Sequence, residues 1–328
     1  NLSFSIDYFI AKSYDVITYD ISLPLTSGSS GNPPVNAASL ENKGIEFTAT
    51  YRQNNKPFNW DITLNLTHIK NKVTGLGQVG IGKTYVQSGD ARTEIGNPIG
   101  EWFTLKTNGI FQSQEEINNY KNKNGDLLQP WAKPGDIRYV DVDEDGTINI
   151  DKDRTYVGTP WPKIEGGLVW NGSFKNFTFG IQLYGVAGNK IYNRPRFWLD
   201  RMDENASYRS GVQPWTASNP TDFPRAAYGN PDQGTQFNTF PQTDRWLESG
   251  SYLRLRNLEI GYAIPATALN RVGFKTARVY VSGQNLLTFT KYTGLDPDIT
   301  GVNIYERGLD AGQYPALRIY SAGLQFGF

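Results

Sequence analysis

The residues of this sequence best placed for chemistry are the carboxylates between Asp141 and Asp153. The run D-V-D-E-D-G-T-I-N-I-D-K-D has aspartates at alternate positions, followed by a glycine. Oxygens with this spacing converge on Ca²⁺ in EF-hand-type loops, where glycine permits a sharp turn. Lys152 stands where that loop needs its closing acid, so the run predicts either a hard-cation site or an acidic turn closed by hydrogen bonds. The candidate ligands for calcium are Asp141, Asp143, Asp145, Thr147, Asp151 and Asp153.

Catalytic groupings are weaker than this candidate metal site. The single histidine, His68, has no zinc or nucleophile motif beside it; if the strands described below close into a barrel, we expect His68 in its lumen or at its rim. Asp200, Asp203 and Glu204 are close in sequence, as a glycosidase pair would require, but acid-rich loops are common in proteins without catalysis. We therefore predict no enzyme, no catalytic residue and no cofactor other than calcium.

Aromatic residues form a third candidate group, because they alternate with arginines between residues 194 and 246. Flat rings beside hydrogen-bonding groups bind sugars or peptides. The same rings can instead stabilise a long loop or contact a partner protein, and we favour that interpretation. The candidates for ligand or partner contact are Trp198, Tyr208, Trp215 and Trp246.

Composition limits the class of protein that presents these residues. The chain has 328 residues, of which 38% are hydrophobic, as suits a barrel with a wet interior or a soluble all-β protein. Lysine plus arginine equals aspartate plus glutamate at 32 each, which argues against a nucleic-acid partner. No cysteine is present, and no apolar run reaches about 18 residues, so membrane residence would require a barrel. Because Asn1 opens without a leader or initiator methionine, we expect an earlier part of the protein to be missing.

Apolar and polar residues alternate along the whole chain, which predicts strands. The clearest segments are 2–8, 45–51, 60–66, 177–184 and 277–283. Short turns at 53–57 and 171–176 join some of them, while polar stretches at about 71–162 and 185–250 separate others. Short turns at one end and long loops at the other are typical of outer-membrane barrels, and we expect roughly ten strands in one domain over 1–328. A start signal at Ser113 predicts a short helix over Gln114–Lys123.

The final segment, Tyr320–Phe328, alternates up to its last residue. Its apolar side chains would face lipid together in a barrel, whereas a soluble sandwich would bury them. A last strand that stops on an aromatic residue resembles the C-terminal signal by which outer-membrane barrels are recognised for assembly. Phe326 and Phe328 would then carry that signal.

Several phrases, in order along the chain, resemble the C-terminal barrel region of SusC-like (RagA-like) TonB-dependent transporters. They are N-K-G-I-E from Asn42, I-G-N-P-I-G from Ile95, P-G-D-I-R-Y-V-D from Pro134, Y-L-R-L-R-N-L-E-I-G-Y from Tyr252, V-Y-V-S-G-Q-N-L-L-T from Val279 and Y-T-G-L-D-P-D from Tyr292. Each phrase alone is weak, and the ordered set is specific.

The resemblance implies an all-β, antiparallel transmembrane barrel of roughly 22 strands with a plugged lumen and long extracellular loops, of which this chain would supply the C-terminal part. It further implies TonB-dependent import of oligosaccharides or peptides across the outer membrane. Partners would be a SusD-like surface lipoprotein, outer-membrane lipid, and the TonB complex through the missing N-terminal part. The alternative is a soluble or surface-attached all-β glycan-binding protein without transport activity.

Overall fold

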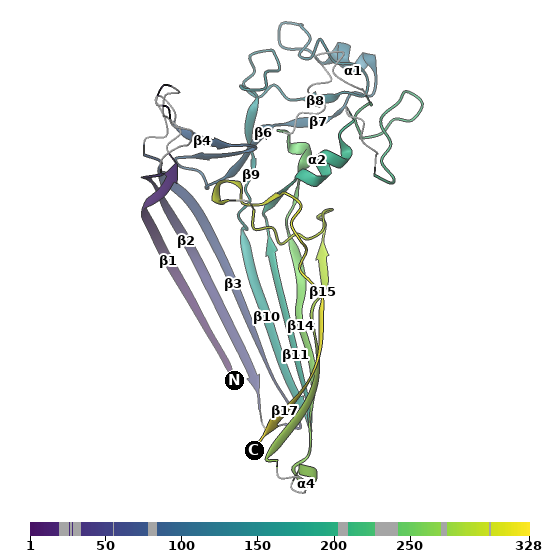
Figure 1. The fold of residues 1–328 in the computed structure, drawn as a ribbon. Helices are drawn as coiled ribbons and strands as arrows, with labels where there is room; N and C mark the ends of the chain where they lie inside the picture. The colour runs from purple at the N-terminus through teal and green to yellow at the C-terminus, as the bar shows by residue number, and fades with distance from the viewer. Residues whose placement is uncertain are drawn as a thin grey trace.

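One long antiparallel sheet dominates the computed structural model, which describes residues 1–19, 26, 28, 34–54, 56–77, 84–202, 209–226, 242–269, 274–301 and 303–328. Its eight strands are hydrogen-bonded in the order in which the chain reaches them (Figure 1). They are β1 (Leu2–Tyr19), β2 (Pro34–Gln53), β3 (Phe58–Gly75), β10 (Ile164–Phe174), β11 (Phe177–Ala187), β14 (Tyr252–Ala263), β15 (Thr276–Thr290) and β17 (Ile319–Gly327). Both β1 and β17 are edge strands, so this sheet, which we call the wall, is open on both sides.

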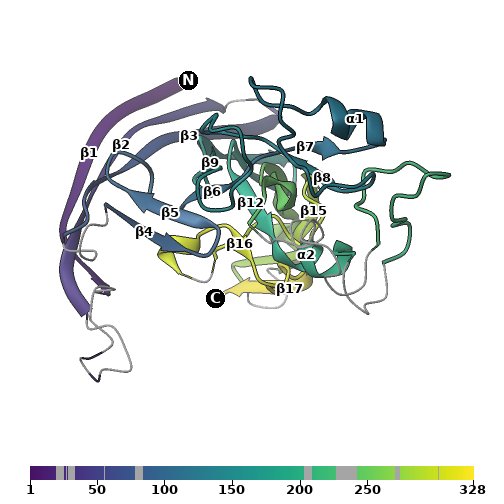
Figure 2. The same ribbon diagram turned by 90° about the horizontal axis from the view of Figure 1, so that it is seen from above.

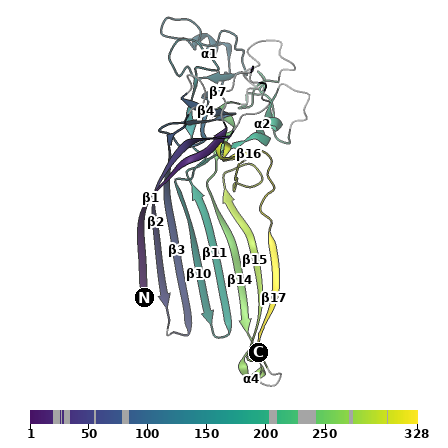
Figure 3. The same ribbon diagram turned by 60° about the vertical axis from the view of Figure 1, so that its left-hand side comes forward.

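The two ends of this wall differ in their connections (Figure 3). At one end, β10 and β11 are joined by Lys175 and Asn176 alone, and Lys175 has the positive φ of 51° that tight hairpin turns use. The predicted turn at 171–176 was therefore too long, because Asn171–Phe174 continues β10. The β14–β15 connection at the same end carries α4 (Ala266–Leu269). Among the described residues, eight strands form this sheet, where the sequence predicts roughly ten.

At the opposite end the long connections fold into what we call the cap, the described residues of 76–163, 188–251 and 291–318. Its strands are β4 (Tyr85–Ser88), β5 (Ala91–Glu94), β6 (Glu101–Leu105), β7 (Thr107–Ile110), β8 (Ile137–Tyr139), β9 (Arg154–Gly158), β12 (Lys190–Asn193), β13 (Leu247–Ser249) and β16 (Leu309–Asp310). Its helices are α1 (Gln114–Asn119), α2 (Arg194–Asp200), η2 (Asp244–Trp246) and η3 (Ile304–Glu306). Seen from above, the cap lies beside the curved β1–β3 segment (Figure 2).

Helix α1 confirms the predicted start signal. The Ser113 hydroxyl oxygen accepts a hydrogen bond from the Glu116 amide at 3.2 Å, as an N-cap should. The helix ends at Asn119, before the predicted Lys123, because Asn122 folds the following residues into a turn. Its side-chain oxygen accepts from the amides of Asn124 and Asp126.

The hydrophobic core lies in the cap. One cluster of buried side chains joins all three of its segments: Ala91, Trp102, Tyr192, Phe197, Trp246 and Leu309. The long stretches between strands are thus packed structure with their own apolar interior. Within the described ranges, no helix is long and apolar enough to cross a membrane.

Candidate functional site

The strand register shows that the sheet has one continuous apolar face. Residues directly opposite each other on paired strands point to the same face of a sheet. One such row runs across seven neighbouring strands and consists of Phe4, Ala49, Leu64, Leu168, Leu183, Leu255 and Leu287. Its outer members are open to the surroundings, with 69% of Phe4 and 51% of Leu287 exposed. A contiguous exposed apolar surface of this extent requires an apolar environment.

The opposite face of the same strands is polar and hydrogen-bonded. The Thr48 hydroxyl donates to Asn65 at 2.8 Å, and the Asn171 amide donates to Asp61 at 3.1 Å. Near the short-turn end, this face holds a hollow of about 370 Å³. One side of that hollow is the Arg278 guanidinium, which contacts Glu259 at 2.6 Å. Alternating faces of this kind are the pattern of a membrane barrel with a wet lumen.

An irregularity in β14 places two arginines on the polar face. Opposite Leu183 and Ile181 of β11 lie Leu255 and Leu258, so Arg256 is an extra residue that breaks the alternation. The sequence carried a signal for this bulge, because the apolar residues of β14 are spaced two, three and two apart from Leu253 to Ile260.

These arginines fasten the 291–318 segment to the wall. Arg254, only 2% exposed, contacts Asp296 at 2.5 Å and Asp298 at 3.4 Å. Arg256 reaches Asp298 at 3.3 Å and lies over the Tyr184 ring. Tyr184 therefore belongs to the polar face.

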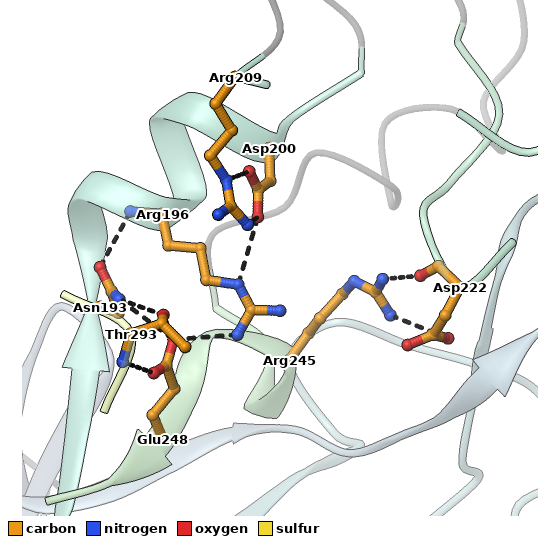
Figure 4. A network of polar contacts seen from close by, with 8 residues as sticks. All are labelled: Asn193, Arg196, Asp200, Arg209, Asp222, Arg245, Glu248 and Thr293. Atoms are coloured by element: carbon orange, nitrogen blue, oxygen red, sulfur yellow. Dashed lines mark hydrogen bonds and ion pairs between the residues drawn. The ribbon is translucent and has the colours of Figure 1, made fainter. Parts of the chain in front are cut away.

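A second network of charges holds the cap together (Figure 4). On α2, Arg196 donates to Asp200 at 3.2 Å and to Glu248 of β13 at 3.0 Å. Arg209 also donates to Asp200, which is buried. Both carboxylate oxygens of Asp200 therefore accept hydrogen bonds from arginines of the cap itself. The other two acids considered for a glycosidase, Asp203 and Glu204, lie outside the described residues.

One buried and one partly buried acid of the cap were not expected from the sequence. Burial raises the pKa of Asp90 to about 7, although the Arg194 guanidinium at 3.5 Å lowers it. Burial also raises the pKa of Glu101 to about 7. No local motif distinguishes either residue, since their burial comes from packing between segments far apart in the chain.

The acidic loop brings together three of its six candidate ligands. One carboxylate oxygen from each of Asp141, Asp143 and Asp145 lies within 4.8 Å of the others. The Asp141 Oδ2 atom accepts from the Gly146 amide at 2.9 Å, while its Oδ1 atom is buried and accepts no hydrogen bond from the described residues. Lys152 contacts Asp145 at 2.9 Å and so supplies a positive charge at this edge of the loop.

The other three candidate ligands each make a different set of contacts. Asp153 is buried and accepts from the amides of Val142 and Asn149, which closes the loop. Thr147 donates both its amide and its hydroxyl to Asp145. The Asp151 side chain is 92% exposed and faces Arg154.

The aromatic candidates differ in their access to a ligand. Trp198 on α2 is 53% exposed, with the Arg201 guanidinium 4.9 Å from its ring. Trp215 is partly buried and donates to Gln112 at 2.8 Å. Trp246 is 1% exposed in the core of the cap, which leaves it no surface for a ligand. Tyr208 lies outside the described residues.

Phe326 and Phe328 end the apolar face at its lower edge. Both rings contact Phe274, with centroids 4.9 Å and 5.1 Å away, and both side chains are exposed.

His68 lies opposite Ile45 on the apolar face, near its border with the cap, and contacts the Lys163 carbonyl. It is therefore a residue of the rim.

Comparison with known proteins finds relatives in sequence and solved structures with a similar fold. No family model matches the chain. TonB-dependent receptor P26 of Formosa agariphila is 32% identical over 98% of this chain, and TonB-dependent receptor SusC of Bacteroides thetaiotaomicron is 26% identical over 98% of it. A solved structure described as the RagAB peptide transporter covers the whole chain with a TM-score of 0.77 at 23% identity, which supports the barrel fold.

These relatives are receptors and transporters rather than enzymes. The chain spans about a third of their length, 32% for the Formosa receptor and 33% for the RagAB chain. It is a homologue of the SusC-like TonB-dependent receptors and has the fold of their barrel.

Proposed function

We propose that the whole protein is an outer-membrane importer energised through TonB, in which this chain forms part of the barrel wall and its extracellular cap. The observation that carries the proposal is the apolar row across seven strands with a polar face behind it. A protein folded in water would bury such a row, whereas a barrel exposes it to lipid. The homology to TonB-dependent receptors supports the coupling to TonB.

The cargo in this proposal is an oligosaccharide or a peptide, delivered with a SusD-like surface lipoprotein. Support comes from the names of the relatives, since one is SusC and one solved structure is described as a peptide transporter. The partly exposed Trp198 beside Arg201 offers a ring and a cation for contact with cargo or lipoprotein. Trp215 has a more limited surface for the same role.

Uptake by cells that carry the whole protein tests the proposal. We expect labelled oligosaccharides or labelled peptides to accumulate, and expect accumulation to stop when TonB is deleted. The protein should fractionate with the outer membrane and need detergent for extraction. A soluble protein that binds glycan without uptake would contradict import and establish the alternative function.

We also propose that the acidic loop binds calcium as a structural ion. Its support is the convergence of three carboxylates together with the buried, unpaired Asp141 Oδ1 atom. Ca²⁺ takes several oxygen ligands, so backbone carbonyls or water would complete the shell. This ion would stiffen the cap and take no part in moving cargo.

A further inference from the structure

Lysines gather on the apolar face of β1–β3 where that face meets the cap. The last wholly apolar row on these strands consists of Ile6, Phe47 and Leu66, and the next consists of Tyr8, Ile45 and His68. Beyond it lie two charged rows: Ile10, Lys43 and Lys70, then Lys12, Glu41 and Lys72. We call these last two rows the lysine border.

The lysine border carries a net positive charge. Its four lysines are exposed, and they surround the single acid Glu41. Lys43 contacts Glu41 at 2.8 Å and Lys12 approaches it to 3.9 Å. Other acids of these strands, such as Asp7 and Glu46, alternate onto the polar face, so they do not neutralise the border.

The inner side of the same strands is already covered. Asn71 and Val73 alternate with Lys70 and Lys72 along β3, and both are buried against the cap. The Asn71 side chain accepts from the Ile99 amide at 2.9 Å. The lysines are therefore directed outward, away from the lumen and from any cargo within it.

Below this level, the apolar face contains a groove. The groove has a volume of about 370 Å³, and leucines dominate its lining. Gly166 and Gly185 lie opposite each other within it, and their missing side chains create the depression. It extends from β3 to β14, beginning beside Leu66, four residues before Lys70.

We infer that the lysine border binds the anionic phosphate headgroup of a membrane lipid whose acyl chains lie along the apolar face toward the groove. Positive side chains at the edge of an apolar band match the charge of such headgroups, and their aliphatic stems can cover the upper part of the band. This inference depends on the proposed membrane location. It adds a lipid site of defined residues to the barrel.

The test uses the whole protein in a non-ionic detergent and measures lipid binding by native mass spectrometry. The probes are phosphatidylglycerol and phosphatidylcholine with identical acyl chains, so that only the headgroup charge differs. We expect the wild-type protein to prefer phosphatidylglycerol. The K43Q/K70Q variant should bind it about 25-fold more weakly, because each lysine near an anionic surface contributes a factor of about five.

Two further variants separate a site from a general effect of charge. E41Q removes the acid of the border and should tighten phosphatidylglycerol binding about fivefold, a gain that damage to the fold would not produce. K106Q/K121Q makes the same charge change as K43Q/K70Q at exposed cap lysines and should leave binding unchanged. Equal weakening in both double variants would overturn the inference.

Failure of this inference is distinguishable from failure of the proposed function. A detergent-dependent barrel whose K43Q/K70Q form keeps the wild-type affinity for phosphatidylglycerol overturns the lipid site alone. A protein that is stable without detergent and retains neither lipid overturns both the lipid site and the membrane location.

Discussion

At the scale of single residues, Arg254 shows how a charge is accommodated in the wall. It is buried, and its guanidinium binds Asp296, Asp298 and the Thr288 hydroxyl. Removing one member of a buried ion pair leaves its partner's charge uncompensated, which costs about 3 kcal/mol. We expect Arg254→Met to destabilise the whole protein by about that amount in thermal unfolding.

The control for this prediction is Arg318→Met, an exposed arginine at the end of the segment that Arg254 anchors. It should change the melting temperature little. The double variant R254M/D296N should recover part of the lost stability, because it removes both charges together. Equal melting of R254M and the wild-type protein would show that Arg254 does not fasten the 291–318 segment.

The raised pKa of Asp90 predicts that the stability of the cap depends on pH. Burial raises its folded-state pKa to about 7 from the ordinary 3.8, so between these values the folded state binds the proton more tightly than the unfolded state. Stability must therefore fall as pH rises through this window, by at most about 4 kcal/mol for this group. We expect the melting temperature of D90N to depend less on pH between 5 and 8 than that of the wild-type protein. Parallel pH profiles would contradict this assignment.

At the scale of elements, the acidic loop separates what spacing alone can predict from what it cannot. Alternation brought Asp141, Asp143 and Asp145 together, because alternate residues of a tight turn share one side. The role of Asp153 depends on amides at both ends of the loop, which spacing does not reveal. Lys152 instead approaches Asp145, and its hydrogen bond lowers the pKa of that carboxyl.

Calcium should therefore raise the melting temperature of the protein, and a chelator should reverse the rise. Asp143→Asn is expected to reduce the calcium effect, because Asp143 is one of the three converging carboxylates. Asp151→Asn is the matched control in the same loop, since its side chain is almost fully exposed and faces Arg154. An identical calcium response in both variants, or none in the wild-type protein, would exclude the site.

The last strand makes a separate prediction about assembly. If Phe328 and Phe326 carry the recognition signal, Phe328→Ser should lower the amount of folded barrel in the outer membrane several-fold. Tyr320→Ser is the control, because it removes an exposed aromatic residue from the other end of β17. Immunoblots that follow the folded and unfolded forms would measure the effect, and equal loss in both variants would assign it to lost lipid contact alone.

The positions of the long strands could be predicted from the sequence because alternation is a local pattern. The structure of the cap could not be predicted in this way. The alternating segments at 2–8, 45–51, 60–66, 177–184 and 277–283 all lie within strands of the sheet. Cap strands are two to five residues long, too short for a periodic signal. Their partners are distant, as in the parallel pairing of Tyr192 with Leu309. The ion pairs of Arg254 and Arg196 likewise join residues far apart in the chain.

At the scale of the whole molecule, the two faces of the sheet assign opposite environments to neighbouring residues. Leu168 belongs to the row that crosses seven strands, while Val169 pairs with Thr63 and Gln182 on the polar face. In the proposed barrel, lipid surrounds Leu168 and the wet lumen surrounds Val169. In the soluble alternative, the apolar face would have to be covered by protein, because its outer members Phe4 and Leu287 are 69% and 51% exposed.

This contrast gives a pair of substitutions matched in charge and position. Leu168→Arg should destabilise the whole protein folded in a bilayer by about 2–4 kcal/mol, because an arginine would face lipid near the middle of the strand. Val169→Arg should cost much less, since the lumen solvates its charge. Reversible folding into lipid vesicles in a urea titration measures both. If the two variants lost the same stability, the face bearing Leu168 would not be in contact with lipid, and the membrane location would have to be abandoned together with the import that depends on it.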